Sequence, residues 1–142
     1  MERWGKSRLT EKQMAEFPGD TLFDKIARAV CRAGTLPVKE LYEAWETARR
    51  IRRKFRGGRV LDLAGGHGLL AHILILMDDT SKEALVVDAD IPKNAGRLSE
   101  AIISEWPRLA GRICYIEASI ADVAVFPDDL VASVHACGTL TD

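Results

Sequence analysis

Residues 59–71 read R-V-L-D-L-A-G-G-H-G-L-L-A, and this stretch decides the fold. Residues 60–63 predict a short buried strand in which Asp62 is the one charged residue. Three glycines follow, and the almost wholly apolar run Leu69–Met77 after them predicts a helix. In α/β folds a strand that leads into a helix through glycines builds a nucleotide site. The glycines let the backbone approach a ligand closely, and the helix N-terminus offers unpaired N–H groups.

Strands and helices alternate along the rest of the chain. The predicted strands are Ala84–Asp88, Arg112–Glu117 and Asp129–Ala136, and Pro92 begins a predicted helix over Lys93–Trp106. Such alternation implies parallel strands that are joined by right-handed crossovers. We therefore expect an α/β fold with a parallel sheet.

The residues before the glycine turn predict two amphipathic helices. Asp20 is a favourable N-cap for a helix over Thr21–Ala33. A second helix opens near Pro37 and runs to about Phe55. The helix expected over Leu69–Asp78 is apolar on all sides, and such a helix is usually covered on both. We expect the two N-terminal helices to supply the second cover.

Charge is divided unevenly between the two parts that these patterns define. An N-terminal helical extension, residues 1–58, precedes an α/β half-domain, residues 59–142. Residues 1–59 contain 15 Lys and Arg against 8 Asp and Glu, whereas residues 60–142 contain 5 against 13. We expect the acidic part to hold a small-molecule site. The basic part either meets an anionic partner or neutralises its own neighbour.

Composition excludes several classes of protein. The 142 residues are 47% hydrophobic and 29% charged, which is typical of one globular domain with its own core. No apolar run is long enough for a bilayer and no signal-peptide pattern follows Met1, so we expect a cytoplasmic protein without a membrane partner. The three cysteines form no C-x-x-C pair. His67, His135 and Cys137 lack the spacing of a metal site, so no metal is expected.

The order of these features resembles that of the class I S-adenosylmethionine-dependent methyltransferases, over about Val60–Asp142. The first strand and loop of that Rossmann-like family commonly read D-x-G-x-G-x-G. Here D-L-A-G-G-H-G places Asp62 on the acid. Ala64, Gly66 and Gly68 fall on the three glycines. The resemblance implies S-adenosylmethionine as cofactor, S-adenosylhomocysteine as product, and methyl transfer to an acceptor that the sequence does not identify.

Acidic and polar residues after the next two strands complete the expected site. Asp88 lies twenty residues after Gly68 and matches the acid that holds the ribose hydroxyls in that family. A carboxylate suits this role because it accepts from both hydroxyls at once. Ser119 falls where many members carry an acid that contacts the adenine. The expected cofactor-binding residues are Asp62, Ala64, Gly65, Gly66, His67, Gly68, Asp88, Ala89, Ser119 and His135.

The end of the chain, V-H-A-C-G-T-L-T-D, is similar to an H-x-C-G turn after strand four in a subset of the family that includes some RNA methyltransferases. His135 is a candidate catalytic base, a pocket residue through its backbone, or a packing residue. The family's sheet usually has seven strands in the order 3-2-1-4-5-7-6, of which this chain supplies 3-2-1-4. Three explanations stay open: a fragment of a longer enzyme, a homodimer through strand four and the C-terminal edge, or a short domain that binds cofactor without turnover.

Two other functions compete with this hypothesis. Gly66-x-Gly68-x-x-Ala71 with Asp88 also fits an NAD(P)-binding oxidoreductase. A non-catalytic binding module with a vestigial cofactor site is the second alternative. The basic run Arg49–Arg56 would then carry the interaction, with RNA for example. The neutral explanation of this run is that its cations complement a helix C-terminus while Ile51 and Phe55 face the core.

Overall fold

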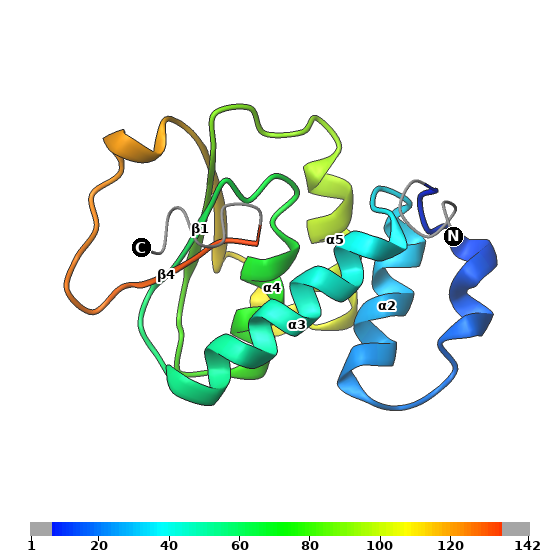
Figure 1. Cartoon of the computed structure of the whole chain (residues 1–142). Helices are drawn as coiled ribbons and strands as arrows, with labels where there is room; N and C mark the ends of the chain where they lie inside the picture. Colours follow the sequence, from blue (N-terminus) through cyan, green and yellow to red (C-terminus); the bar gives the residue numbers. More distant parts are fainter. Residues whose placement is uncertain (1–6, 135–142) are drawn as a thin grey trace.

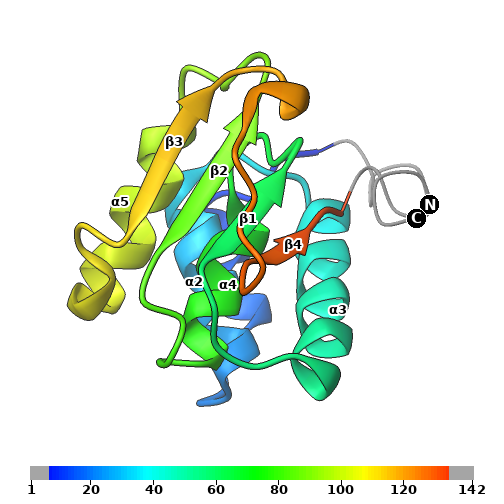
Figure 2. The same cartoon turned by 90° about the vertical axis from the view of Figure 1, so that its left-hand side faces the viewer.

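Four parallel strands form a single sheet in the computed structural model, which describes residues 7–134. The strands are β1 (Val60–Leu63), β2 (Ala84–Asp88), β3 (Ile113–Glu117) and β4 (Leu130–Ala132), and their spatial order is β3-β2-β1-β4 (Figure 2). This arrangement confirms the predicted α/β class and strand order. β4 is shorter than predicted, and residues 135 and 136 of the predicted strand lie outside the described part of the chain.

The sheet register places alternate side chains on two faces. Asp62 pairs with Val86 of β2 on one side and with Ala132 of β4 on the other. These residues face the helices, whereas Leu61 and Val87 belong to a separate apolar cluster on the opposite face. β1 is therefore buried on both faces, as expected for a central parallel strand.

Two layers of helices cover the first face of the sheet. α4 (Leu69–Met77) and α5 (Ala95–Glu105) lie next to the sheet, α3 (Val38–Lys54) runs beside α4 on the β4 side, and α2 (Leu22–Ala33) lies farther from the sheet (Figure 1 and Figure 2). α3 packs against α4 and α2 against α5. α4 is buried on nearly every side because the sheet and α3 both pack against it, as its all-round apolar sequence predicted.

The opposite face of the sheet is covered by one connection, residues 118–129. It contains the short helix η3 (Ile120–Asp122) and crosses in front of β1 in Figure 2. Ile120 and Val123 pack on the apolar cluster of that face. Arg59 holds the end of the connection through Asp129, with Nη2–Oδ2 and Nε–Oδ1 distances of 2.7 and 3.1 Å. The other connections include η1 (Glu11–Glu16) and η2 (Pro107–Leu109).

Two expectations about the N-terminal helices are wrong. Thr21 rather than Asp20 caps α2, because the Thr21 hydroxyl accepts the N–H of Asp24 at 3.1 Å. Phe55 follows the last residue of α3 in an extended conformation, and its side chain is 55% exposed instead of facing the core. Ile51 does pack against the core as expected.

Candidate functional site

A left-handed backbone shapes the turn between β1 and α4. Gly66 has φ 55° and Gly68 has φ 84°, and Ala64 has φ 54°. Ala64 is the one non-glycine residue with positive φ in the described part of the chain. L-residues other than glycine, asparagine and aspartate rarely adopt this conformation. The alanine at the first glycine position of the motif therefore retains a conformation that glycine would adopt without strain.

The glycines of the turn serve different purposes. A Cβ atom on Gly65 would lie 2.8 Å from Val86 Cγ1, and one on Gly68 would lie 2.8 Å from Val86 Cγ2. These two glycines let the turn pack closely over β2. A Cβ atom on Gly66 would meet nothing within 4 Å. The space above Gly66 is therefore open to a ligand.

Asp88 meets the glycine turn at the end of β2. Its Oδ2 accepts the N–H of Gly66 at 2.9 Å, and its Oδ1 accepts the N–H of Asp90 at 3.0 Å. The structure thus brings together the predicted ribose acid and the most open of the glycines. Ala89 follows at an exposed position.

Asp62 caps the helix that follows the turn. Its side chain is 1% exposed, and its Oδ2 accepts the N–H of Ala71, in the first turn of α4, at 3.1 Å. Burial raises the pKa of Asp62 to about 7; the Ala71 N–H opposes this shift, and the charge of Asp88 adds to it. Near neutral pH Asp62 is therefore partly protonated and partly ionised.

His67 links the turn to the beginning of α5. Its Nε2 lies 2.6 Å from Asn94 Oδ1, and its carbonyl oxygen accepts the Tyr115 hydroxyl at 2.7 Å. Tyr115, on β3, was not predicted as part of the site. The sequence shows only an aromatic residue within the predicted third strand. In the sheet Tyr115 pairs with Val86, so the two side chains lie on the same face.

His72 is a core histidine, as expected. It is fully buried; its Nδ1 donates to the carbonyl of Gly68 at 2.7 Å, and its Nε2 lies 3.1 Å from Ser99 Oγ. Because a carbonyl can only accept, Nδ1 carries the proton and Nε2 accepts from the serine hydroxyl. Burial lowers the pKa of His72 to about 4, so the ring is neutral at pH 7.

The end of β3 brings further predicted residues to the same edge of the sheet. The N–H of Ala118 donates to the Asp88 carbonyl at 3.0 Å, which places Ser119 beside the end of β2. The Ser119 hydroxyl caps η3 by accepting the N–H of Ala121 at 3.2 Å. Glu117, which was not predicted, accepts the N–H of Ile91 at 3.0 Å and fixes the loop after Asp88. His135 and Cys137 lie outside the described residues.

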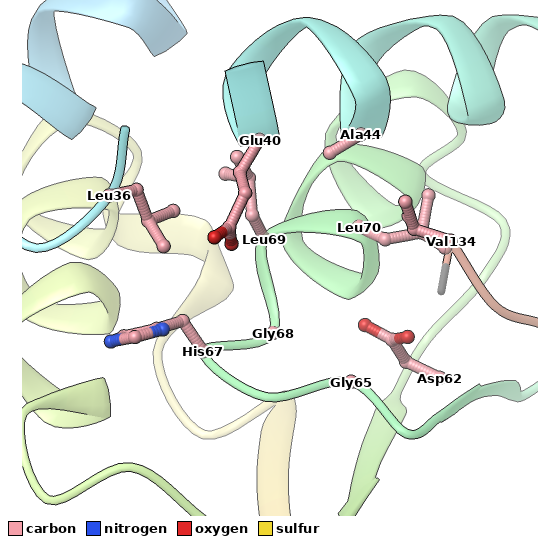
Figure 3. A pocket seen from close by; sticks show the side chains of 10 residues that line it. All are labelled: Leu36, Glu40, Ala44, Asp62, Gly65, His67, Gly68, Leu69, Leu70 and Val134. Atoms are coloured by element: carbon pink, nitrogen blue, oxygen red, sulfur yellow. The ribbon is translucent and has the colours of Figure 1, made fainter. Parts of the chain in front are cut away.

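A small cavity of about 20 Å³ lies between the glycine turn and the beginning of α3 (Figure 3). Its ionisable lining residues in the described part of the chain are Asp62, Glu40 and His67. Glu40 was missed because no pattern in the sequence tells which residues of α3 face the turn. Among residues 7–134 the lining consists of Leu36, Glu40, Ala44, Asp62, Gly65, His67, Gly68, Leu69, Leu70 and Val134.

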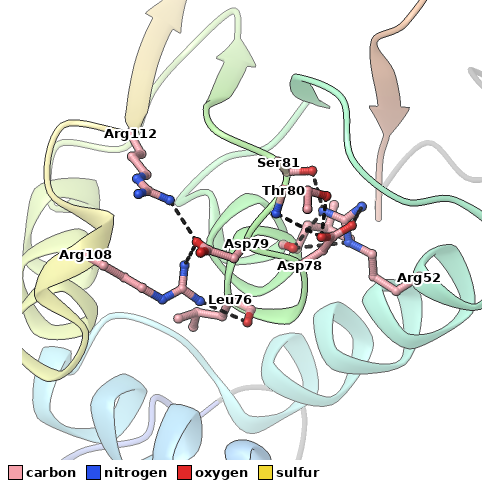
Figure 4. Close-up of polar contacts among 9 residues, drawn as sticks. Arg52, Leu76, Asp78, Asp79, Thr80, Ser81, Arg108 and Arg112 are labelled. Carbon is pink, nitrogen blue, oxygen red and sulfur yellow. Dashed lines mark hydrogen bonds and ion pairs between the residues drawn. The ribbon is translucent and has the colours of Figure 1, made fainter.

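The basic run Arg49–Arg56 divides into two groups. Arg52 is 4% exposed; it donates to Leu74 O and Ser81 Oγ at 2.8 Å each and lies 3.4 Å from Asp78 Oδ2 (Figure 4). The Arg52 guanidinium therefore binds a backbone carbonyl near the C-terminal end of α4. Hydrogen bonds from Thr80 and Gly57 lower the pKa of Asp78 to about 2, and Arg52 adds to the effect.

Three exposed arginines of this run, Arg49, Arg53 and Arg56, line a second, open depression of about 410 Å³. Arg53 and Arg56 are exposed there and have no ion pair within residues 7–134, whereas Arg49 lies 3.0 Å from Glu46. The apolar side chains that complete the depression are Leu22, Leu76 and Met77. The surface thus combines unpaired cations with an apolar floor.

Residues 7–134 contain neither a membrane-spanning helix nor a cluster of metal ligands. Among these residues no helix is both long and apolar enough to cross a membrane. The same residues contain no group of three or more His, Cys, Asp or Glu side chains that could hold a metal ion.

Comparison with known proteins adds a distant structural likeness. No family model matches the chain, and no curated protein matches it in sequence. Among solved structures, the chain is similar to the crystal structure of a putative RNA methyltransferase from Pyrococcus horikoshii, with a TM-score of 0.44 and 20% identity. The match covers 68% of this chain and 43% of that chain, so the chain spans less than half of that protein's length.

Proposed function

We propose that this chain is the cofactor-binding part of an S-adenosylmethionine-dependent methyltransferase. The observation that carries the proposal is the position of Asp62 and Asp88 on either side of an open glycine turn. Asp88 offers two carboxylate oxygens at the point where a ribose would meet Gly66, in exchange for its present N–H partners. The bound cofactor would supply a methyl group on a sulfonium.

Asp62 favours this cofactor over a nicotinamide dinucleotide. In dinucleotide-binding folds the pyrophosphate lies at the N-terminus of the helix after the glycine turn. Here the Asp62 carboxylate already accepts the Ala71 N–H at that helix terminus. A pyrophosphate would meet this buried acid at close range and be repelled when the acid is ionised. A cofactor without phosphate avoids that repulsion.

The residues of the chain would chiefly align the cofactor and exclude water. Methyl transfer is an in-line displacement, so its rate depends on holding the sulfonium in a fixed position relative to the acceptor. Gly65 and Gly68 hold the turn against β2, and the contact of His67 with Asn94 fixes its outer side. His135 stays a candidate base of the proposal.

Parallel calorimetric titrations with S-adenosylmethionine, S-adenosylhomocysteine and NAD test the proposal. We expect the first two to bind and Asp88→Ala to abolish binding. Asp90→Ala is the matched control, because Asp90 is an exposed acid that contributes only its N–H to Asp88. Binding of NAD alone would establish the oxidoreductase alternative. The absence of binding by any of the three would favour a non-catalytic module.

We also propose RNA as a partner of the depression around Arg53 and Arg56. Unpaired guanidinium groups bind phosphates and stack on bases, and the apolar floor suits exposed bases. Joint replacement of Arg53 and Arg56 by alanine should weaken binding of single-stranded RNA and flatten its salt dependence. Lys39→Ala, in the first turn of the same helix, is the control. Equal binding by both variants would contradict this assignment.

The edge position of β4 supports a homodimer as a further proposal. β4 has one neighbour, β1, in the described sheet, so its other edge is available for a strand of a second copy. Light scattering over a concentration series is the test. A monomer at the highest concentration would contradict it.

A further inference from the structure

We infer that single-stranded RNA crosses the end of the molecule at which α4 finishes, and that Phe55 stacks on one of its bases. At the same end an RNA phosphate replaces Asp79 as the partner of Arg108 and Arg112. The inference rests on the proposed RNA partner and deepens it, because it assigns contacts outside the depression described above. Arg108 and Arg112 lie far from the basic run in the sequence, so no local pattern assigns them this role.

Arg108 and Arg112 share a single acid, Asp79, in the turn after α4. Their Nη1 atoms lie 2.7 and 3.1 Å from the same oxygen, Asp79 Oδ1 (Figure 4). The hydrogen bond from Arg112 and the charge of Arg108 hold the pKa of Asp79 below its ordinary value, so the acid is ionised at neutral pH. Its side chain is 63% exposed, and exposed ion pairs contribute little to folding. One positive charge is thus left in excess, and the acid can be displaced.

Phe55 lies at the same end of the molecule and exposes its ring to solvent. Its carbonyl accepts Arg52 Nη1 at 3.3 Å, and the N–H of Gly57 donates to Asp78 Oδ2 at 2.7 Å. The backbone around Phe55 is therefore held against the turn that contains Asp79. An exposed aromatic ring among cations is what proteins use to stack the bases of single-stranded nucleic acids.

The C-terminal end of α4 separates two groups of cations. Arg53 and Arg56 line the depression together with Leu76. The carbonyl oxygen of the same Leu76 accepts Arg108 Nη2 at 3.2 Å. In Figure 4 α3 lies on one side of this helix end, and Arg108 and Arg112 lie on the other. RNA that crosses the end of α4 therefore meets cations on both sides and can contact more phosphates than the depression alone offers.

The chemistry of this surface favours single-stranded RNA. The two non-bridging oxygens of a phosphodiester can accept from Arg108 and Arg112 in place of Asp79 Oδ1. A surface ring can stack on a base only if the base is unpaired, which selects a single strand. A membrane would instead need a continuous apolar face, whereas the neighbours of Phe55 in the chain are the exposed cations Lys54 and Arg56.

This surface and the glycine turn lie at opposite ends of α4. The helix has nine residues, so its ends are about 12 Å apart at a rise of about 1.5 Å per residue. Contacts at the C-terminal end therefore hold the RNA and do not themselves present an acceptor to the cofactor. Substitutions there should leave S-adenosylhomocysteine binding unchanged, which provides a control for folding.

Fluorescence anisotropy with a labelled single-stranded RNA of about twelve nucleotides tests the role of Asp79. We expect Asp79→Asn to tighten binding by about threefold or more, because the phosphate no longer displaces a carboxylate. Asp90→Asn removes the same charge from an exposed acid near the glycine turn and should have little effect. Arg112→Ala should weaken binding, flatten its salt dependence and reduce the gain from Asp79→Asn. Equal effects of Asp79→Asn and Asp90→Asn would overturn the assignment of Asp79.

Phe55→Ala tests base stacking. We expect it to weaken binding of the single strand by about fivefold or more and to leave binding of an RNA duplex unchanged. Phe55→Trp should retain binding. Phe126→Ala is the matched control, because Phe126 is 57% exposed but lies on the connection across the other face of the sheet. Equal losses with single-stranded and duplex RNA, or no loss at all, would overturn the assignment of Phe55.

Vesicles of phosphatidylserine and phosphatidylcholine distinguish RNA from an anionic membrane. If the variants change vesicle binding and RNA binding alike, the surface is a membrane site and the inference is overturned. If joint replacement of Arg53 and Arg56 weakens RNA binding but the Asp79 and Phe55 variants do not alter it, the RNA partner stands and this inference fails. If the wild-type chain does not bind RNA, both fail, whereas the cofactor proposal is decided separately by its own titration.

Discussion

Asp62 Oδ2 lies 3.1 Å from the amide nitrogen of Ala71, so an acid on the central strand caps the helix that the glycine turn begins. The contact closes the turn at its base, because it joins the last residues before the turn to the first residues after it. Burial in this position is also what raises the pKa of Asp62 to about 7.

The pH dependence of stability should reveal two opposed titrations. Folded Asp62, with a pKa of about 7 against 3.8 when unfolded, keeps a proton that the unfolded chain loses. Folded His72, with a pKa of about 4 against 6.5, lacks a proton that the unfolded chain gains. Between about pH 4 and 6.5 Asp62 therefore lowers the free energy of unfolding as pH rises, and His72 raises it. The two effects cancel in this range.

Single substitutions should expose each titration. In Asp62→Asn only the effect of His72 remains, so the free energy of unfolding should rise from pH 4 to 6.5, by up to about 1.4 kcal/mol per pH unit. In His72→Gln it should fall over the same range. Urea denaturation at several pH values measures both slopes. Parallel curves for the two variants would contradict the assigned pKa values.

Ala64→Gly should stabilise the protein. Ala64 has φ 54°, a conformation that costs an alanine about 1 kcal/mol and a glycine nothing. Part of the gain is offset because glycine makes the unfolded chain more flexible. We expect an increase of about 0.5 kcal/mol in the free energy of unfolding. A decrease in the denaturation midpoint would show that packing of the alanine methyl group stabilises the fold by more than the backbone strain destabilises it.

Alanine substitutions at two glycines should separate folding from binding. Gly68→Ala places a methyl group 2.8 Å from Val86 and 3.2 Å from Tyr115, so we expect it to destabilise by about 3 kcal/mol or more. Gly66→Ala meets no atom within 4 Å and adds only the strain of φ 55°, about 1 kcal/mol. Its methyl group would nevertheless occupy the open side of the turn. Thermal unfolding and cofactor titration together should show a folded Gly66→Ala chain with weakened binding.

Arg52 and Arg53 should differ in their contribution to the free energy of unfolding. Arg52→Met removes the donor to Leu74 O and leaves the buried Asp78 without its cation, so we expect a loss of about 3 kcal/mol. Arg53→Met changes an exposed side chain and should alter stability by at most about 0.5 kcal/mol. Urea denaturation of the two variants is the measurement. Equal losses would mean that Arg53 also supports the fold.

β1 and β2 were predictable because each is a short apolar run with a distinctive feature at its end, whereas β4 is shorter than predicted. β1 runs into glycine and β2 ends at Asp88, and both strands have the predicted bounds. Their order followed from the family resemblance. The end of a helix is harder to predict, because neighbouring residues compete for it. Thr21 displaces Asp20 as the cap of α2 through one hydrogen bond, a choice that the composition of the segment does not reveal.

Long-range contacts explain what the sequence did not predict about the site. Glu40 enters the cavity only because α3 packs across α4, and Tyr115 reaches His67 only because β3 lies beside β2. Arg52 has the same chemistry as its neighbours in the basic run. Its burial depends on the position of the C-terminal end of α4, more than twenty residues later in the chain. No local pattern contains this information.

The packing of α4 against both the sheet and α3 has a consequence for synthesis on the ribosome. α2 and α3 leave the exit tunnel first, but their main partners, α5 and α4, are translated later. Until then the apolar stripes of the first two helices lack the surfaces they cover in the finished protein. The nascent chain should therefore stay open to proteases and chaperones until α5 has emerged, and it should acquire resistance in one late step rather than helix by helix.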